Sequence, residues 1–106
     1  MIASIRRYLS ALRKDYGLDA RAAVLFGSHA RGAADEWSDI DVVILADRFD
    51  RAITVEDVEL LWLAAARTDS RIEPIPCGER QWLDDDKHAI IEIARREGLM
   101  VPAETA

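Results

Sequence analysis

Two short apolar runs set the tightest limit on how this chain folds. The first is Ala22–Phe26, which ends abruptly at Gly27-Ser28, and the second follows Asp39 and extends to residue 46. Apolar runs of about 4–8 residues are typical of buried strands. The second run is apolar on both faces beyond its acidic start, which predicts a strand in the centre of a sheet.

Two acidic residues open the second run. Asp39 and Asp41 are separated by one residue, so in an extended strand they point to the same side with Cα atoms about 6.5–7 Å apart. Carboxylates set that close repel each other, and each resists burial. Nothing in the local sequence neutralises them. The pair therefore predicts one or two bound divalent cations, and Mg²⁺ prefers such oxygen ligands.

The residues that follow the first run suit a phosphate. Gly27 at the end of a buried strand lets the backbone approach a ligand closely. Residues 28–32 are predicted to form a helical turn whose backbone N–H groups attract anions, and Ser28 adds a hydroxyl donor. Two metals in a phosphoryl-transfer site usually need a further carboxylate. Glu73, on a predicted third strand, is the best candidate to hold a metal and to take the proton of an attacking hydroxyl.

The remaining pattern predicts an α/β (α+β) fold with a small mixed β-sheet flanked by helices. The expected elements in chain order are a helix over 2–16 ended by Gly17, strands over 22–26 and 39–46, a helix with a Thr54/Asp57 capping box, a strand over 71–75, a last helix capped by one of the residues 84–86 and ended by Gly98, and an extended segment over 99–101. Pro74 and Pro76 place the third strand at an edge or at a strand end.

Four further predictions concern individual side chains or segments. Trp62 is predicted to lie in the core, His29 to face solvent, Cys77 to be a small structural residue, and the tail from Pro102 to be frayed.

Composition excludes several function classes. The chain is expected to be one domain of 106 residues with its core over about 22–101. A net charge of −6 argues against direct nucleic-acid binding, and no apolar run reaches the roughly 20 residues that span a bilayer. The single cysteine forms no internal disulfide, which favours a cytoplasmic protein. A homo-oligomer is compatible with these observations.

Two blocks of this sequence resemble a known family. Leu25-Phe26-Gly27-Ser28-x-Ala30-Arg31-Gly32, then Ser38-Asp39-x-Asp41, is similar to the minimal nucleotidyltransferases of the DNA polymerase beta superfamily, the antitoxin partners of HEPN-type toxins. The family motif is Gly-Ser, about ten residues, then Asp-x-Asp, and ten residues separate Ser28 from Asp39 here. The likeness spans roughly residues 22 to 101.

The resemblance implies a fold and a reaction. It implies a polymerase beta-like nucleotidyltransferase fold and the transfer of AMP from ATP, with one or two Mg²⁺ ions, to a hydroxyl on a partner protein, typically a HEPN-type toxin. By similarity, Gly27 and Ser28 bind the nucleoside triphosphate, Asp39 and Asp41 hold the metals, and Glu73 completes the catalytic and metal site.

One departure from the family keeps alternatives open. The third acid of the family is usually Asp, whereas Glu73 is longer by one methylene, and Pro74 and Pro76 flank it atypically. We expect the strand backbone to compensate. An inactive module that neutralises its toxin by binding alone remains an alternative, and nucleotidylation of a small molecule, which would require a dimer to build the acceptor pocket, is a second.

Overall fold

A computed structural model describes residues 1–27, 29–30, 32, 38–84 and 88–103. The elements in chain order are α1 (Ile2–Tyr16), β1 (Ala22–Phe26), β2 (Ile40–Leu45), the 3₁₀ helix η1 (Asp47–Asp50), α2 (Val55–Thr68), β3 (Ile72–Cys77), α3 (Glu79–Asp84), α4 (Ala89–Glu97) and β4 (Leu99–Pro102). The other predicted helices and strands are all present, whereas the helical turn predicted over 28–32 lies partly outside the described residues. The short helices η1 and α3 were not predicted, because each is too brief to show a helical period.

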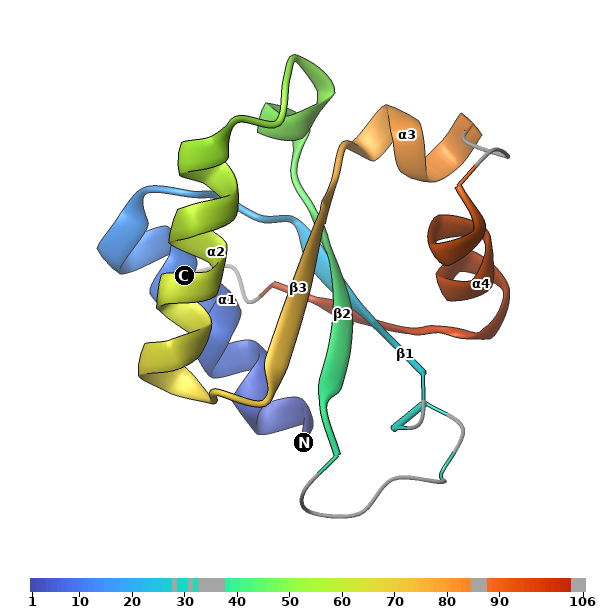
Figure 1. Ribbon diagram of the computed structural model, residues 1–106, viewed down its shortest axis with the longest axis horizontal. Helices are drawn as coiled ribbons and strands as arrows, with labels where there is room; N and C mark the ends of the chain where they lie inside the picture. The colour runs from blue at the N-terminus through green and yellow to red at the C-terminus, as the bar shows by residue number, and fades with distance from the viewer. Residues whose placement is uncertain (28, 31, 33–37, 85–87, 104–106) are drawn as a thin grey trace.

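The four strands form one mixed sheet in the order β3-β2-β1-β4 (Figure 1). β1 pairs with β2 and β4 in antiparallel register, whereas β2 and β3 run parallel. The α/β class and the central position predicted for the second apolar run are therefore confirmed. Because β1 and β2 are antiparallel, the end of the first and the start of the second lie at the same end of the sheet.

β3 lies at an edge, as its prolines predicted. The backbone N–H of Ile40 donates to the carbonyl oxygen of Arg71 at 2.8 Å. The backbone N–H and C=O groups alternate in direction along a strand. Those of the odd-numbered residues of β3 therefore point toward β2, and those of the even-numbered residues point to the open edge. Pro74 and Pro76 thus turn their nitrogens to the open edge, where the missing N–H breaks no ladder hydrogen bond.

Helices cover the two faces of the sheet in pairs, with α1 and α2 on one side and α3 and α4 on the other (Figure 1). On the α1/α2 side the buried sheet residues are Ala23, Leu25, Ile40, Val42, Ile44, Ile72 and Val101. On the α4 side they are Ala22, Val24, Val43, Leu45 and Cys77. The alternation along each strand explains this division, since successive side chains point to opposite faces. Cys77 is buried, as expected of a small structural residue.

α1 occupies the predicted range and ends as predicted. Gly17 adopts a left-handed conformation, with φ of 68°, and the N–H of Leu18 donates to the carbonyl oxygen of Leu12 at 2.9 Å. The bond satisfies a carbonyl group near the end of the helix, where the chain leaves through a glycine in the αL region. The buried hydroxyl of Tyr8 donates to the carbonyl oxygen of Leu61 at 2.9 Å, which joins α1 to α2. Burial raises the pKa of Tyr8, so the hydroxyl stays a donor.

The capping box predicted for α2 is present. The N–H of Thr54 donates to Oδ2 of Asp57, and the N–H of Asp57 donates to Oγ1 of Thr54, both at 3.1 Å. Asp57 is 2 % exposed, and Nη2 of Arg48 lies 3.0 Å from its Oδ1, an atom that accepts no hydrogen bond of good geometry. The ion pair offsets part of the cost of burying this carboxylate.

Asp57→Ala is expected to destabilise the fold by about 1–3 kcal/mol, because it removes the half of the capping box that Asp57 supplies and leaves the Thr54 backbone N–H without its acceptor. The measurement is the free energy of unfolding by chemical denaturation. Glu59→Ala, an exposed change on the same helix, is the matched control and should stay within about 0.5 kcal/mol of the parent. Equal effects of the two substitutions would contradict the assigned role of the cap.

Three predictions about the helices and the C-terminal tail are wrong. Trp62 is 47 % exposed rather than in the core, because α2 turns its Leu61, Ala64 and Ala65 side inward. The N-cap of α4 is His88, which makes no capping side-chain hydrogen bond, and α3 occupies the chain up to Asp84. Pro102 belongs to β4, and the N–H of Ala103 donates to the carbonyl oxygen of Arg21 at 2.9 Å, so these two residues are not frayed.

The last predicted helix begins at Ala89 and ends at Gly98, as expected. Its buried residues are Ile91 and Ala94, whereas Ile90 is 48 % exposed. None of the described helices combines the length and apolar character needed to cross a membrane.

Candidate active site

The sheet brings the three predicted acidic residues together. Asp41 on β2 is paired with Glu73 on β3 in the parallel register, and with Phe26 on β1 in the antiparallel one. Residues paired directly across a sheet point to the same face. Asp41 and Glu73 therefore project to the side of the sheet that α4 covers, at the end where β2 begins. Asp39 is exposed, whereas Asp41 and Glu73 are partly buried.

The carboxylates are close enough to interact strongly. Partial burial, together with hydrogen bonding to Asp41 and Asp39 and the charge of both, raises the pKa of Glu73 above its ordinary value of 4.5. The largest cause is burial, which disfavours the charged form, and the two neighbouring negative charges add to it. In the described part of the chain, the ion pairs join arginines to Glu79, Asp57 and Asp69, and none reaches these three carboxylates.

Glu73→Gln is expected to raise the melting temperature at pH 7.5 by about 1–3 °C, because it removes one of three repelling charges on a partly exposed site. The raised pKa fixes the sign of the pH dependence. The penalty is absent below the ordinary pKa, where the carboxyl is protonated in both folded and unfolded states, and is fully present above the raised value.

The two proteins should therefore melt at the same temperature near pH 4 and diverge as the pH rises, which thermal unfolding across a pH series measures. Glu92→Gln, an exposed substitution on α4, is the control. If the parent had a higher melting temperature than Glu73→Gln at neutral pH, the Glu73 carboxylate would be stabilised by its surroundings rather than repelled.

Gly27 places its backbone directly against the acids. Its φ is 75°, and a Cβ built on it would lie 2.6 Å from Oδ2 of Asp41. Only glycine adopts this conformation and tolerates this approach at low cost. The close neighbour of the backbone at this position is the carboxylate of Asp41, while the predicted approach to a ligand stays a prediction. The strand end and the acidic pair thus form one site.

The prediction for His29, which lies close to Gly27 in the chain, is wrong. Ser28 lies outside the described residues. His29, expected to face solvent, is partly buried, and its Nε2 lies 3.2 Å from the carbonyl oxygen of Ser38. The hydrogen bond requires Nε2 to carry the proton. It joins His29 to Ser38, the residue before Asp39. The spacing of residues in the sequence does not reveal this contact.

These donor atoms fit a hard divalent cation. Within the described ranges, no group of three or more His, Cys, Asp or Glu residues already converges on one point as a metal site. The chemistry of the donor set nevertheless suits Mg²⁺, which is bound through one or two carboxylates together with phosphate oxygens and water. Asp39, Asp41 and Glu73 are the residues that would hold it. A cation there would also relieve the repulsion that raises the pKa of Glu73.

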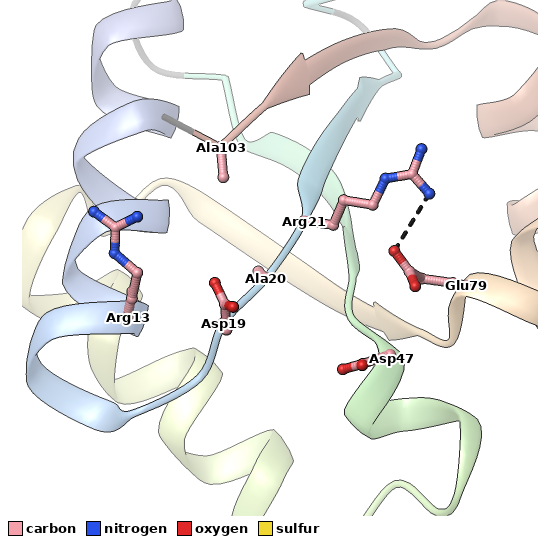
Figure 2. Close-up of a pocket in the computed structure, with 7 residues that line it drawn as sticks. All are labelled: Arg13, Asp19, Ala20, Arg21, Asp47, Glu79 and Ala103. Carbon is pink, nitrogen blue, oxygen red and sulfur yellow. Dashed lines mark hydrogen bonds and ion pairs between the residues drawn. The ribbon is translucent and has the colours of Figure 1, made fainter. Parts of the chain in front are cut away.

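A second charged hollow lies at the opposite end of the sheet, and its electrostatics differ. It encloses about 300 Å³ and is lined by Arg13, Asp19, Ala20, Arg21, Asp47, Glu79 and Ala103 (Figure 2). There Nη1 of Arg21 lies 3.3 Å from Oε1 of Glu79. One acid of this hollow, Glu79, is paired with an arginine, whereas no ion pair within the described residues reaches Asp39, Asp41 or Glu73.

Comparison with known proteins supports a family assignment. The sequence model of a family described as "Nucleotidyltransferase domain" matches residues 5–96. Two proteins of Methanocaldococcus jannaschii named "putative protein adenylyltransferase" are similar to parts of the chain. One is 36 % identical over 58 residues, which cover 50 % of this chain and 40 % of the relative. The other is 41 % identical over 44 residues, which cover 42 % and 44 %. Each match thus spans less than half of the relative.

A solved structure has the same fold. The crystal structure of a "putative nucleotidyltransferase" from Sulfolobus solfataricus superposes with a TM-score of 0.61 at 16 % identity, and covers 94 % of this chain and 78 % of that one. The arrangement of the sheet and helices is therefore shared, while the sequence identity is too low to carry over individual residues.

Proposed function

This chain belongs to the nucleotidyltransferase domain family, and from that premise we propose that it transfers AMP from ATP to a hydroxyl group on a partner protein. The observation that carries the proposal is the pairing of Asp41 and Glu73 on one face of the sheet, with Asp39 just before β2 and near Glu73, and with the Gly27 backbone against the Asp41 carboxylate. The names of the two archaeal relatives support a protein as acceptor.

Each residue of the site has a role in this reaction. Asp39, Asp41 and Glu73 hold one or two Mg²⁺ ions, which when bound supply the positive charge that screens the triphosphate and polarises the reacting phosphoryl group. The Gly27 bend lets the triphosphate approach the backbone closely, and Ser28, by similarity to the family motif, donates its hydroxyl to a phosphate. The chain's own acidic surface repels a bare triphosphate, so substrate binding depends on divalent cation.

The proposed reaction is a displacement at the α-phosphorus of ATP. The acceptor oxygen bonds to the α-phosphorus of ATP, the bond from that phosphorus to the bridging oxygen of the β-phosphate breaks, and pyrophosphate leaves. The Glu73 carboxylate takes the proton of the acceptor hydroxyl.

The partner we propose is a HEPN-type toxin, with this chain acting as its antitoxin. The resemblance of the Gly27-Ser28 and Asp39-x-Asp41 blocks to the minimal nucleotidyltransferases supports this assignment. In this proposal, attachment of AMP silences the toxin.

One experiment tests the reaction. The purified chain is incubated with Mg²⁺, ATP labelled on the α-phosphate and the protein encoded beside it in the genome, and AMP attachment is followed by intact mass. We expect a gain of one AMP on the neighbouring protein, lost when EDTA removes the metal. Neutralisation of the neighbour without any attached label would overturn the enzymatic proposal in favour of binding alone. Label found only on an aminoglycoside would establish a small-molecule acceptor instead.

A further inference from the structure

The outer side of α2 is apolar where a surface helix is normally polar. Val55 is 69 % exposed, Val58 37 %, Trp62 47 % and Leu63 45 %. Spacings of three and four residues place Val55, Val58 and Trp62 on one line along the helix, with Leu63 beside it. We refer to these four residues as the α2 stripe.

Packing within the chain does not account for this surface. α2 buries a different side against the sheet and α1, through Leu61, Ala64 and Ala65. Val58 stands at the position that packs against the residue before an N-cap, here Ile53, which itself is 43 % exposed. That local contact does not explain why Val55 is exposed, or why about half of Trp62 is exposed to water. A clustered apolar surface with a tryptophan at its centre is characteristic of a protein–protein interface.

The charges beside the stripe indicate what covers it. Glu56 lies six residues before Trp62 and Arg67 lies five residues after it, and both are exposed. If two copies of α2 pack antiparallel with Trp62 at the centre, Glu56 of each protomer and Arg67 of the other lie on the same flank of the interface, at nearly the same height along the helices. The arrangement repeats itself about a twofold axis, as an isologous interface requires. Antiparallel helices also set each positive N-terminus near a negative C-terminus.

We propose that the α2 stripe is the interface of a symmetric dimer of this chain, in which the two α2 helices pack antiparallel. α2 covers the side of the sheet opposite α3 and α4 (Figure 1), whereas Asp41 and Glu73 project to the α4 side. Dimerisation therefore leaves the candidate active site open. The inference does not rest on the proposed reaction, and its test is read in molecular mass rather than in activity.

Sedimentation equilibrium over a dilution series measures the dimer. We expect the parent to dissociate on dilution, and Trp62→Glu to raise the dissociation constant roughly 30-fold or more, because it places two charges at the centre of the interface. Leu83→Glu is the matched control, since Leu83 is 74 % exposed on α3, away from the stripe. A parent that sediments as a monomer at every concentration overturns the proposal, including the case in which another protein covers the stripe.

A charge exchange tests the antiparallel geometry and does not depend on Trp62→Glu remaining folded. Glu56→Arg alone and Arg67→Glu alone each place like charges together and should weaken the dimer about tenfold. The double variant carrying both changes should restore the parent's dissociation constant within about threefold. If the double variant does not recover the parent's dissociation constant, although its thermal melt matches those of the single variants, this pairing is rejected. Arg67 also donates to the Tyr16 hydroxyl at 2.9 Å, so the melts are compared first.

Discussion

Replacing both Asp39 and Asp41 by asparagine is expected to reduce AMP transfer at least about a thousandfold, because the change removes the negative charge that holds Mg²⁺ and with it several kcal/mol of transition-state stabilisation. The fold should not suffer. The two acids contribute repulsion rather than pairing, as the raised pKa of Glu73 indicates, so the melting temperature of the double variant should equal or exceed that of the parent.

The measurement is the initial rate of label transfer at saturating ATP and Mg²⁺. The matched control is Asp19→Asn with Asp47→Asn, two exposed acids that line the hollow at the other end of the sheet. This control removes the same charge from the molecule and should leave the rate within about twofold, since distant surface charges are screened. A double variant of Asp39 and Asp41 that keeps even a tenth of the parent rate would place the chemistry elsewhere.

Gly27→Ala is expected to reduce the rate by about a hundredfold or more and to destabilise the fold by about 1–2 kcal/mol. The destabilisation arises because an L-residue is strained at a φ of 75°. The loss of rate arises because the added Cβ would lie 2.6 Å from Oδ2 of Asp41 and must displace that carboxylate. A shift of about 1 Å in a reacting group is enough for a loss of this size.

Gly17→Ala separates the two effects. Gly17 has a φ of 68°, close to that of Gly27, but a Cβ built there meets nothing within 4 Å. The two variants should lose similar stability, which denaturant unfolding measures, while Gly17→Ala keeps the parent rate. If both variants lost activity in proportion to stability, the contact between Gly27 and Asp41 would have no special role, and that result would falsify the assigned geometry.

Several features of the site could be predicted from the sequence, because they depend on neighbours in the chain. The alternation of Asp39 and Asp41, the glycine at the end of β1 and the capping box at Thr54 all follow from local spacing. Glu73 is different, because it lies 32 residues beyond Asp41. Its position beside Asp41 depends on the register between β2 and β3, and local periodicity does not set the register between separate segments. The sequence marked Glu73 only as an acid on a predicted strand, and the likeness to a family supported its place in the site.

The sequence by itself determined the order of elements, the mixed α/β class and the two local halves of the site, because hydrophobic periods and turn residues act within a few residues. Only the tertiary structure decided which side of each element is covered. The apolar residues of α2 extend around most of the helix, so the pattern could not tell that Leu61 is buried and Trp62 exposed. The same applies to the bond from His29 to the Ser38 carbonyl, since a contact across a bend forms only after β1 and β2 have paired.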